Sequence, residues 1–509
     1  MFFGVDQNPS TTSNEQDMAD MNEQITDFDP SGTSAIYDAL SPSWRLNRDF
    51  AEMHLHVLRD GEHLDRFGAG SEAGGPADEA ANQYAWRKNA SLAIDHCADL
   101  INLRVDNIFR AAPTRRYDDS PYRDFIDQFL ADVDGGGTDM TSFMRRNLPL
   151  YYVNGVDFVV DKQSPPDGLQ PRTLAQERAM GLLPYVHAFG PLERLDWACD
   201  HAGRYLWARY DLGEMPPEDE TRHDAPVRAY LTVTADQWRL YEVAESGQDP
   251  ITTVITGAIS SGACPIVPFY FKESSRSDYP KVPLSLLTRI APIARYLLNL
   301  TSQIQIDVYR NIAFLVATGV DADKIPGEIA PMGCWALPEG ADLKDVAGDV
   351  EHIRVKLQLA QMLMEAILRI GKLTGAAGDL KSRAASGVQV AVERTDLDNE
   401  MRMTACQAEQ VEQDLVRLAV CRYKGRAVPK SEIRYAAEYN KKYVLTSVAE
   451  LVRQAREFAG MGIHRNGGVP TMLKILLRKI LDAVAKADDQ AYQDALGEIQ
   501  SAAFDGGSQ

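Results

Sequence analysis

The chain has 509 residues, 45% of them hydrophobic, and a formal net charge of −20 at pH 7. This length supports two or more hydrophobic cores, and the apolar fraction is ordinary for a folded protein. The acidic balance argues against a general binder of nucleic acid or membrane surfaces, because a phosphate backbone would be repelled, but it does not exclude a protein that lets DNA pass without gripping it.

The cysteines and the N-terminus indicate the cellular compartment. Six cysteines are scattered along the chain without a CxxC pair, at Cys97, Cys199, Cys264, Cys334, Cys406 and Cys421. We expect reduced, partly buried thiols rather than a disulfide framework or a zinc site. The N-terminus lacks the regions of a signal peptide, and no apolar run approaches the ~20 residues of a membrane span. We therefore expect a protein made in a cytoplasm, with no membrane partner.

The first 150 residues are predicted to be mainly helical. Residues 1–34 are polar and acidic, and we expect a disordered arm. Apolar residues at helical spacing then predict four helices, at 44–66, 84–110, 122–133 and 140–147.

A block of strands is predicted next. Residues 150–161 are β-branched and aromatic around Asn154-Gly155, which predicts a strand hairpin with that pair as its turn. Further strands are predicted at 185–189, 192–195, 204–210, 228–234, 238–243 and 266–271. Since acid- and Pro-rich loops separate them, we expect an α+β block with antiparallel strands.

Three long helices follow, at 283–316, 350–373 and 388–420. Pro292 predicts a kink or a late start in the first. In the second, the predicted packed side is Val355, Leu359, Met362, Leu363, Ala366, Ile367 and Ile370. In the third, apolar residues form a near-heptad seam, at Leu397, Met401, Ala405, Ala408, Val411, Leu415 and Leu418. Periodicity alone favours an ordinary helical core for all three.

Two segments interrupt the long helices, and a last unit follows them. Residues 318–349 are rich in Pro and Gly around a strand-like run at 334–337, and residues 374–387 are mostly small. Beyond the third helix we predict a short strand at 433–439 and helices at 447–458, 470–486 and 488–502.

Catalytic motifs are weak throughout. Ser260 lies two residues before Gly262, but the first Gly of a nucleophile elbow is missing, and prolines rather than a helix follow. Cys199 with His201, and His54 with His56, lack a second pair at zinc spacing. We predict no active site, no metal and no cofactor.

The order of these elements resembles the portal proteins of tailed bacteriophages, particularly those of long-tailed siphophages. The resemblance covers roughly residues 40–500. It depends on the following segments: 152–158, 264–270, 312–320, 374–387, and the helix with Glu409, Glu412 and Leu415.

The resemblance implies a helix-dominated α+β protomer with named parts. These are a disordered acidic arm (1–34), an α+β wing (35–281), two stem helices (282–317 and 350–373), a small clip (318–349), a tunnel loop (374–387), a long wing helix (388–424) and a helical crown (425–509). The candidate clip is shorter than the family's pattern, so its boundaries are the least defined.

The resemblance also implies the function and its sites. Such proteins form homododecameric rings at one capsid vertex, in a virion assembled in the host cytoplasm. The partners implied are further copies of the chain, the terminase large subunit, major capsid and scaffolding proteins, a head-completion adaptor protein and double-stranded DNA. The tunnel loop would face DNA with Gly375, Gly378, Asp379, Lys381, Ser382, Arg383 and Gly387. Docking at the clip would involve Lys324, Glu328, Trp335 and Glu339.

Three alternatives remain open. Lys381 and Arg383 are either phosphate contacts or solvated loop residues. The chain could be a cytoplasmic hydrolase on the α+β block with Ser260 as nucleophile. It could also be another virion scaffolding or structural protein.

Overall fold

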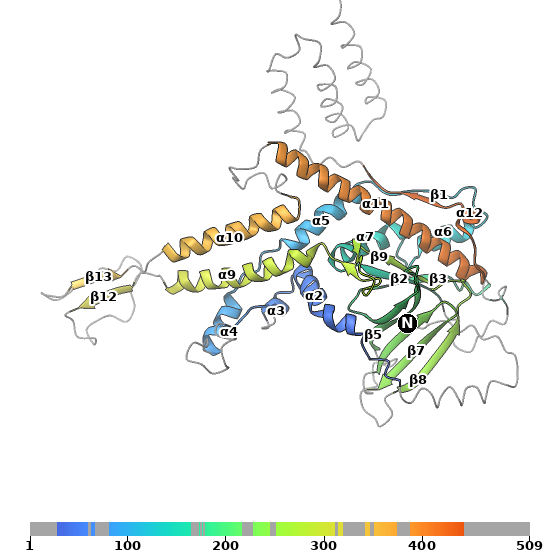
Figure 1. Ribbon diagram of the computed structural model, residues 1–509, viewed down its shortest axis with the longest axis horizontal. Helices are drawn as coiled ribbons and strands as arrows, with labels where there is room; N and C mark the ends of the chain where they lie inside the picture. The colour runs from blue at the N-terminus through green and yellow to red at the C-terminus, as the bar shows by residue number, and fades with distance from the viewer. Residues whose placement is uncertain are drawn as a thin grey trace, which may run out of the picture.

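The computed structural model describes residues 28–59, 63–66, 81–163, 173, 176, 179–215, 227–244, 251–310, 314–318, 342–346, 351–373 and 387–441. These residues form a body of helices and antiparallel sheets, from which a pair of helices projects (Figure 1). The expected mixture of helix and sheet is confirmed. Among the described helices, none has both the length and the hydropathy that crossing a membrane requires.

The described helices run from the N-terminal part of the body to the end of a 38-residue helix. They are α2 (Ala35–Glu52), α3 (Leu55–Arg59), α4 (Ala81–Ala90), α5 (Cys97–Ile108), α6 (Arg123–Ala131), α7 (Met140–Val153), α9 (Ala291–Arg310), α10 (Glu351–Ile370), α11 (Gly387–Lys424), α12 (Lys430–Ile433) and the 3-10 turn η1 (Leu287–Arg289).

The strands among the described residues form two sheets and three isolated pairs. The five-stranded sheet is an antiparallel meander of β4 (Arg194–Cys199), β5 (Tyr205–Met215), β6 (Val227–Thr234), β7 (Gln237–Ala244) and β8 (Ile251–Ala258). The three-stranded sheet has the order β3 (Pro184–Phe189), β2 (Val156–Lys162), β9 (Ile266–Phe269). The pairs are β1 (Thr114–Arg116) with β14 (Ala436–Glu438), β10 (Lys272–Glu273) with β11 (Pro283–Leu284), and β12 (Phe314–Thr318) with β13 (Asp342–Val346).

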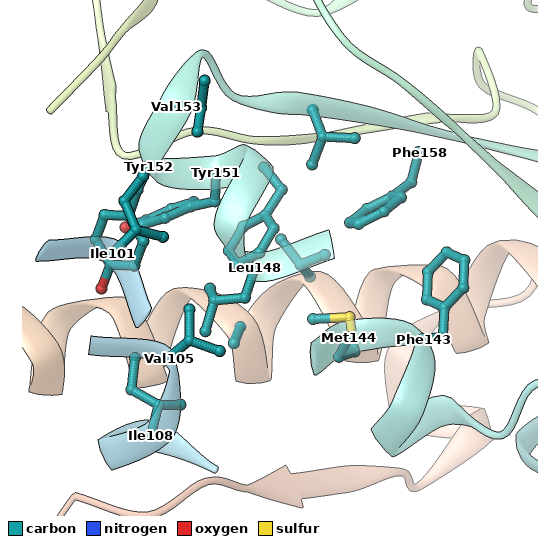
Figure 2. Close-up of a cluster of buried hydrophobic side chains, with 14 of the residues drawn as sticks. Ile101, Val105, Ile108, Phe143, Met144, Leu148, Tyr151, Tyr152, Val153 and Phe158 are labelled. Carbon is teal, nitrogen blue, oxygen red and sulfur yellow. The ribbon is translucent and has the colours of Figure 1, made fainter. Parts of the chain in front are cut away.

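The larger core lies between α11 and the elements on either side of it. Helices α5 and α7 place apolar side chains toward α11 (Figure 2). Every residue of the predicted α11 seam, from Leu397 to Leu418, is at least 93% buried. This part of the sequence prediction is confirmed.

The described chain beyond α11 packs back on the same core. Strand β14 pairs with β1, placing Arg115 opposite Ala437. Glu412 of α11 is fully buried, and its carboxylate accepts hydrogen bonds from Arg115 Nε at 2.7 Å and Tyr439 Oη at 2.5 Å. Residues 425–441 were predicted in the crown, and in the structure they adjoin elements predicted in the wing.

The predicted strand hairpin at 150–161 is wrong in its first half. Residues 150–153 are the last turn of α7, because Leu148, Tyr151 and Tyr152 pack at helical spacing into the larger core. Asn154-Gly155 ends this helix instead of turning a hairpin. The amides of both residues bond to Leu150 O, and Gly155 adopts φ +81°, which glycine accepts readily. The second half of the predicted hairpin is a strand, as expected, and corresponds to β2.

Two predicted helices are divided in the structure. The helix predicted at 84–110 is α4 and α5, separated by residues 91–96. Leu92 and Ile94, which lie in this separating segment, are 56% and 38% exposed. The helix predicted at 44–66 begins earlier, at Ala35, and ends at Met53, whose left-handed backbone separates α2 from α3.

Other boundaries differ in smaller ways. The predicted strands at 185–243 correspond to β3–β7, whereas β8 was not predicted. Residues 28–34 were assigned to the disordered arm, but Phe28 packs on Tyr241 with ring centroids 5.3 Å apart. The helices predicted at 447–502 lie outside the described residues.

Candidate functional site: the projecting hairpin of α9 and α10

Helices α9 and α10 lie side by side and extend away from the body (Figure 1). Helix α9 starts at Ala291, so the late start predicted from Pro292 is confirmed. Its predicted end at 316 is wrong, since 314–318 form strand β12. A strand replaces the last helical turns because β12 pairs with β13, which the insert supplies.

The contact between the two helices follows a heptad. In α10 the buried residues are Ile353, Ala360 and Ile367, each seven positions apart and each at most 8% exposed. This spacing keeps one stripe facing a neighbouring helix over several turns. The carboxylate of Asp307 in α9 forms an ion pair of 2.6 Å with Lys356 Nζ of α10, which supports the contact between the two helices.

The opposite flank of α9 is covered by the N-terminal helices. Asn299 donates from Nδ2 to His63 O at 2.8 Å and accepts from Asp65 N at 2.8 Å. Ser302 Oγ, fully buried, accepts from Arg87 Nη1 at 3.1 Å. Asn299 and Ser302 therefore bind the protein's own chain, and both are buried.

Helix α10 has a second apolar stripe, which the described chain leaves open. Val355 and Met362, seven positions apart, are 55% and 65% exposed. Val355 and Met362 were predicted on the packed side of this helix, and that assignment is wrong within one copy of the chain. The reason is that α10 is apolar on two faces, and Ile353 and Ala360 occupy the inner one.

The far end of the hairpin is a two-stranded ladder. Strand β12 pairs antiparallel with β13 in the register Phe314 with Val346 through Thr318 with Asp342. The ladder lies beyond the ends of α9 and α10, at the greatest distance from the sheets (Figure 1).

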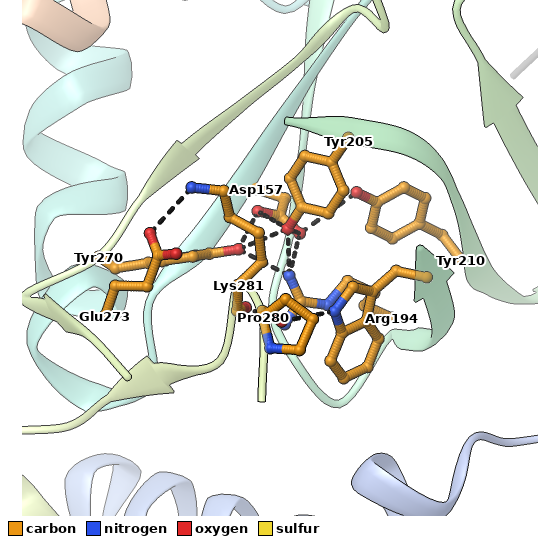
Figure 3. A network of polar contacts seen from close by, with 9 residues as sticks. Asp157, Arg194, Tyr205, Tyr210, Tyr270, Glu273, Pro280 and Lys281 are labelled. Atoms are coloured by element: carbon orange, nitrogen blue, oxygen red, sulfur yellow. Dashed lines mark hydrogen bonds and ion pairs between the residues drawn. The ribbon is translucent and has the colours of Figure 1, made fainter. Parts of the chain in front are cut away.

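A buried polar network holds the root of the hairpin. Arg194 and Asp157 form an ion pair of 2.9 Å, and the hydroxyls of Tyr205, Tyr210 and Tyr270 converge on the Asp157 carboxylate (Figure 3). Burial raises the pKa of all three tyrosines well above the usual range, and the charge of Asp157 adds to this effect. Since every member is at most 8% exposed, this network is structural and has no access for a substrate.

The same network also binds the segment that leads into the hairpin. Arg194 Nη2 donates to Lys281 O at 2.9 Å, and its guanidinium lies 4.1 Å from the Trp197 ring centre. Trp197 Nε1 donates to Pro280 O at 2.8 Å. Sequence reasoning missed this network because its members come from β2, β4, β5 and the residue that follows β9, which are far apart in sequence. The available signal was Asp157, a carboxylate between the apolar residues Val156 and Phe158 of the strand.

Most of the sequence-predicted site residues lie outside the described residues. These are the loop residues Gly375, Gly378, Asp379, Lys381, Ser382 and Arg383, and the docking residues Lys324, Glu328, Trp335 and Glu339. Gly387 is the first residue of α11. The described chain flanks both segments: β12 and β13 flank the docking residues, and α10 and α11 flank the loop.

The weak catalytic motifs are not brought together with a base. Ser260 is exposed after β8, and no hydrogen bond of its hydroxyl to a histidine or carboxylate occurs within the described ranges. His54 and His56 have ring centres 5.8 Å apart and lie around the break between α2 and α3 rather than within one helix. In the part of the chain that the structure covers, no three His, Cys, Asp or Glu side chains group as a metal site requires.

No protein-family model and no curated protein matches this chain. Solved structures with some likeness to it are chains of gene transfer agent particles. One comes from the virion of a native particle, with 14% identity, 74% of this chain and 88% of that chain covered, and a TM-score of 0.32. Another comes from the neck of an empty particle, with 12% identity, coverage of 78% and 89%, and a TM-score of 0.34. Both TM-scores are too low to establish a shared fold.

Proposed function

We propose that this chain is a portal protein: a ring-forming channel at one capsid vertex, through which double-stranded DNA is packaged and ejected. The observation that carries the proposal is the projecting hairpin of α9 and α10, with an apolar stripe left open along α10. The elements also follow one another in the order that the sequence resemblance implies: a body, a helix, a tip, a second helix and then a long helix.

The open stripe supports assembly into a ring. Helix α9 contacts α4 on one flank and α10 on the other, so the two outer flanks face apart (Figure 1). The α10 flank exposes Val355 and Met362, and the segment after α4 exposes Leu92 and Ile94. Two different apolar flanks favour head-to-tail contacts between copies, and such contacts close into rings when the rotation permits. In the proposal, neighbouring copies bury these flanks, in a homododecamer as in the family.

The charge of the chain suits a channel for DNA. A net charge of −20 keeps the duplex from binding tightly to the wall, because phosphates are repelled. In the proposal, Lys381 and Arg383 supply the few phosphate contacts, and the glycines at 375 and 378 give this loop the freedom to follow the DNA.

The tip of the hairpin is the proposed docking platform. Residues 318–349, with Lys324, Glu328, Trp335 and Glu339, would receive the terminase large subunit during packaging and a head-completion adaptor protein afterwards. The body would contact the major capsid and scaffolding proteins. No catalytic group is required for these roles.

The proposal is tested by removing the loop from the assembled protein. Deleting residues 375–382 should leave oligomers intact by negative-stain imaging, while packaging or retention of DNA falls. Loss of assembly would show that the segment is structural and would contradict its channel role. A hydrolase is tested separately: a serine-reactive probe that labels the wild-type chain but not the Ser260→Ala variant would support that alternative.

A further inference from the structure

The C-terminal end of α10 is held by a buried arginine from another helix. Arg104 of α5 is fully buried. Its Nη2 donates to Gly371 O at 2.9 Å, its Nε to Glu400 Oε1 of α11 at 2.9 Å, and its Nη1 to Leu100 O at 2.7 Å. One guanidinium therefore joins three helices, and its fixed fork sets their relative positions.

The turn that ends α10 contains a residue that local geometry disfavours. The amide of Lys372 bonds to Arg369 O and that of Leu373 to Leu368 O, which is the Schellman pattern. Lys372 occupies its left-handed position at φ +57°, where glycine is the usual residue. A lysine there costs about 1 kcal/mol of backbone strain, so a compensating contact is expected.

The side chain of Lys372 makes that contact. Its Nζ lies 2.9 Å from Glu400 Oε2, while Arg104 binds the other carboxylate oxygen. Glu400 is only 11% exposed, so its ion pair with the buried Arg104 is shielded from water, while the Lys372 side chain is 35% exposed. The neighbouring Gly371 is also constrained, since a Cβ at this position would lie 2.4 Å from Leu100 Cδ2.

We propose that Arg104, Lys372 and Glu400 form a latch that locks the end of α10 to α11. The latch fixes the point at which the chain leaves the hairpin, immediately before the segment that the proposed function places against DNA. For its effect on DNA, this inference rests on the proposed function. The three residues are positioning residues and do not themselves contact DNA.

The latch is tested by hydrogen–deuterium exchange of the full-length protein, in peptides that cover residues 365–373. Glu400→Gln removes one carboxylate charge that two cations share. We expect exchange at the end of α10 to become about tenfold faster, since hydrogen bonds to charged groups are worth about 1.5–3 kcal/mol. Exchange in β5–β7 should not change. The matched control is Glu438→Gln, which loses an exposed ion pair with Arg116.

A second variant separates the latch from an ordinary helix end. Lys372→Gly relieves the left-handed strain but removes the ion pair. An ordinary Schellman turn would be stabilised by this change, so slower exchange in residues 365–373 would overturn the latch. Faster exchange, comparable to that of Glu400→Gln, is the expected result.

The proposed role of the latch in the channel is tested by a separate measurement. Particles assembled with Glu400→Gln should contain the normal oligomer but retain less DNA than those with Glu438→Gln. Equal retention would overturn the role of the latch in the channel. A wild-type chain that forms no oligomer would contradict the proposed function while leaving the exchange test of the latch intact.

Discussion

At the scale of residues, strand β2 combines complete burial with two aspartates. Asp157 pairs with Arg194 of β4, and Asp161 pairs with Arg422 of α11 at 3.1 Å. Each arginine belongs to an element distant in sequence, so each pair specifies one arrangement of a sheet against its neighbour. Buried pairs of this kind need not stabilise more than apolar residues would, but breaking one leaves an uncompensated charge.

This gives a first prediction. Arg422→Met leaves Asp161 buried without its cation, and we expect the free energy of unfolding to fall by about 3–5 kcal/mol. Urea denaturation followed by circular dichroism measures the loss. Arg276→Met, which removes an exposed pair with Asp278, is the control and should leave the midpoint unchanged. An Arg422→Met midpoint equal to that of the control would refute this account of β2.

A second prediction concerns the start of α7. Asp139 caps this helix by accepting from Thr141 N at 2.9 Å and Ser142 N at 3.2 Å, and the Ser142 hydroxyl bond lowers its pKa below 3.8. Asp139→Ala should cost about 0.5–2 kcal/mol at neutral pH. Because the folded-state pKa is depressed, the charge-dependent part of the stability is present above pH 3.8 and is lost as the pH falls through the folded value.

The matching control for the cap is Asp139→Asn, which keeps an acceptor oxygen but carries no charge. Thermal unfolding at several pH values compares the three proteins. The difference between the wild type and Asp139→Asn should shrink toward zero below pH 3.8. A difference that grows on acidification would contradict the capping role.

At the scale of elements, the sequence predicts a helix well when it has one apolar face. The seam of α11 is such a case, and its predicted members are buried. Helix α10 is apolar on two faces, so periodicity located the helix but not the face that meets α9. In α7, packing against α11 outweighed the strand preference of Tyr151 and Tyr152, which a local reading of β-branched and aromatic residues cannot anticipate.

The two faces of α10 give a third prediction. Ile367 is fully buried within the chain, and Ile367→Ala should lower the stability of every assembly state by about 2–5 kcal/mol. Met362 is 65% exposed, so Met362→Lys should leave the fold intact but prevent oligomer formation. Circular dichroism and analytical ultracentrifugation separate the two effects. Normal oligomers of Met362→Lys would exclude the outer stripe as a contact between copies.

At the scale of the whole molecule, strands β2–β7 and β9 and helices α9, α10 and α11 follow one another in the predicted order, whereas β8 and β10–β13 were not predicted. Contacts between distant segments could not be predicted in the same way. The pairing of β14 with β1, the bond of Arg115 to Glu412 and the bond of Asn299 to His63 each join residues more than 200 positions apart. The contacts that the proposed ring requires lie between chains, where further copies would cover the open stripe of α10.

The mass of the purified native protein tests this claim most directly. Native mass spectrometry, with negative-stain imaging of the same sample, should give a closed ring of roughly twelve times the chain mass of 56.4 kDa. Met362→Lys should shift that mass to a single chain. A wild-type protein that remains a stable monomer of 56.4 kDa at micromolar concentration, or that forms filaments instead of rings, would contradict the account.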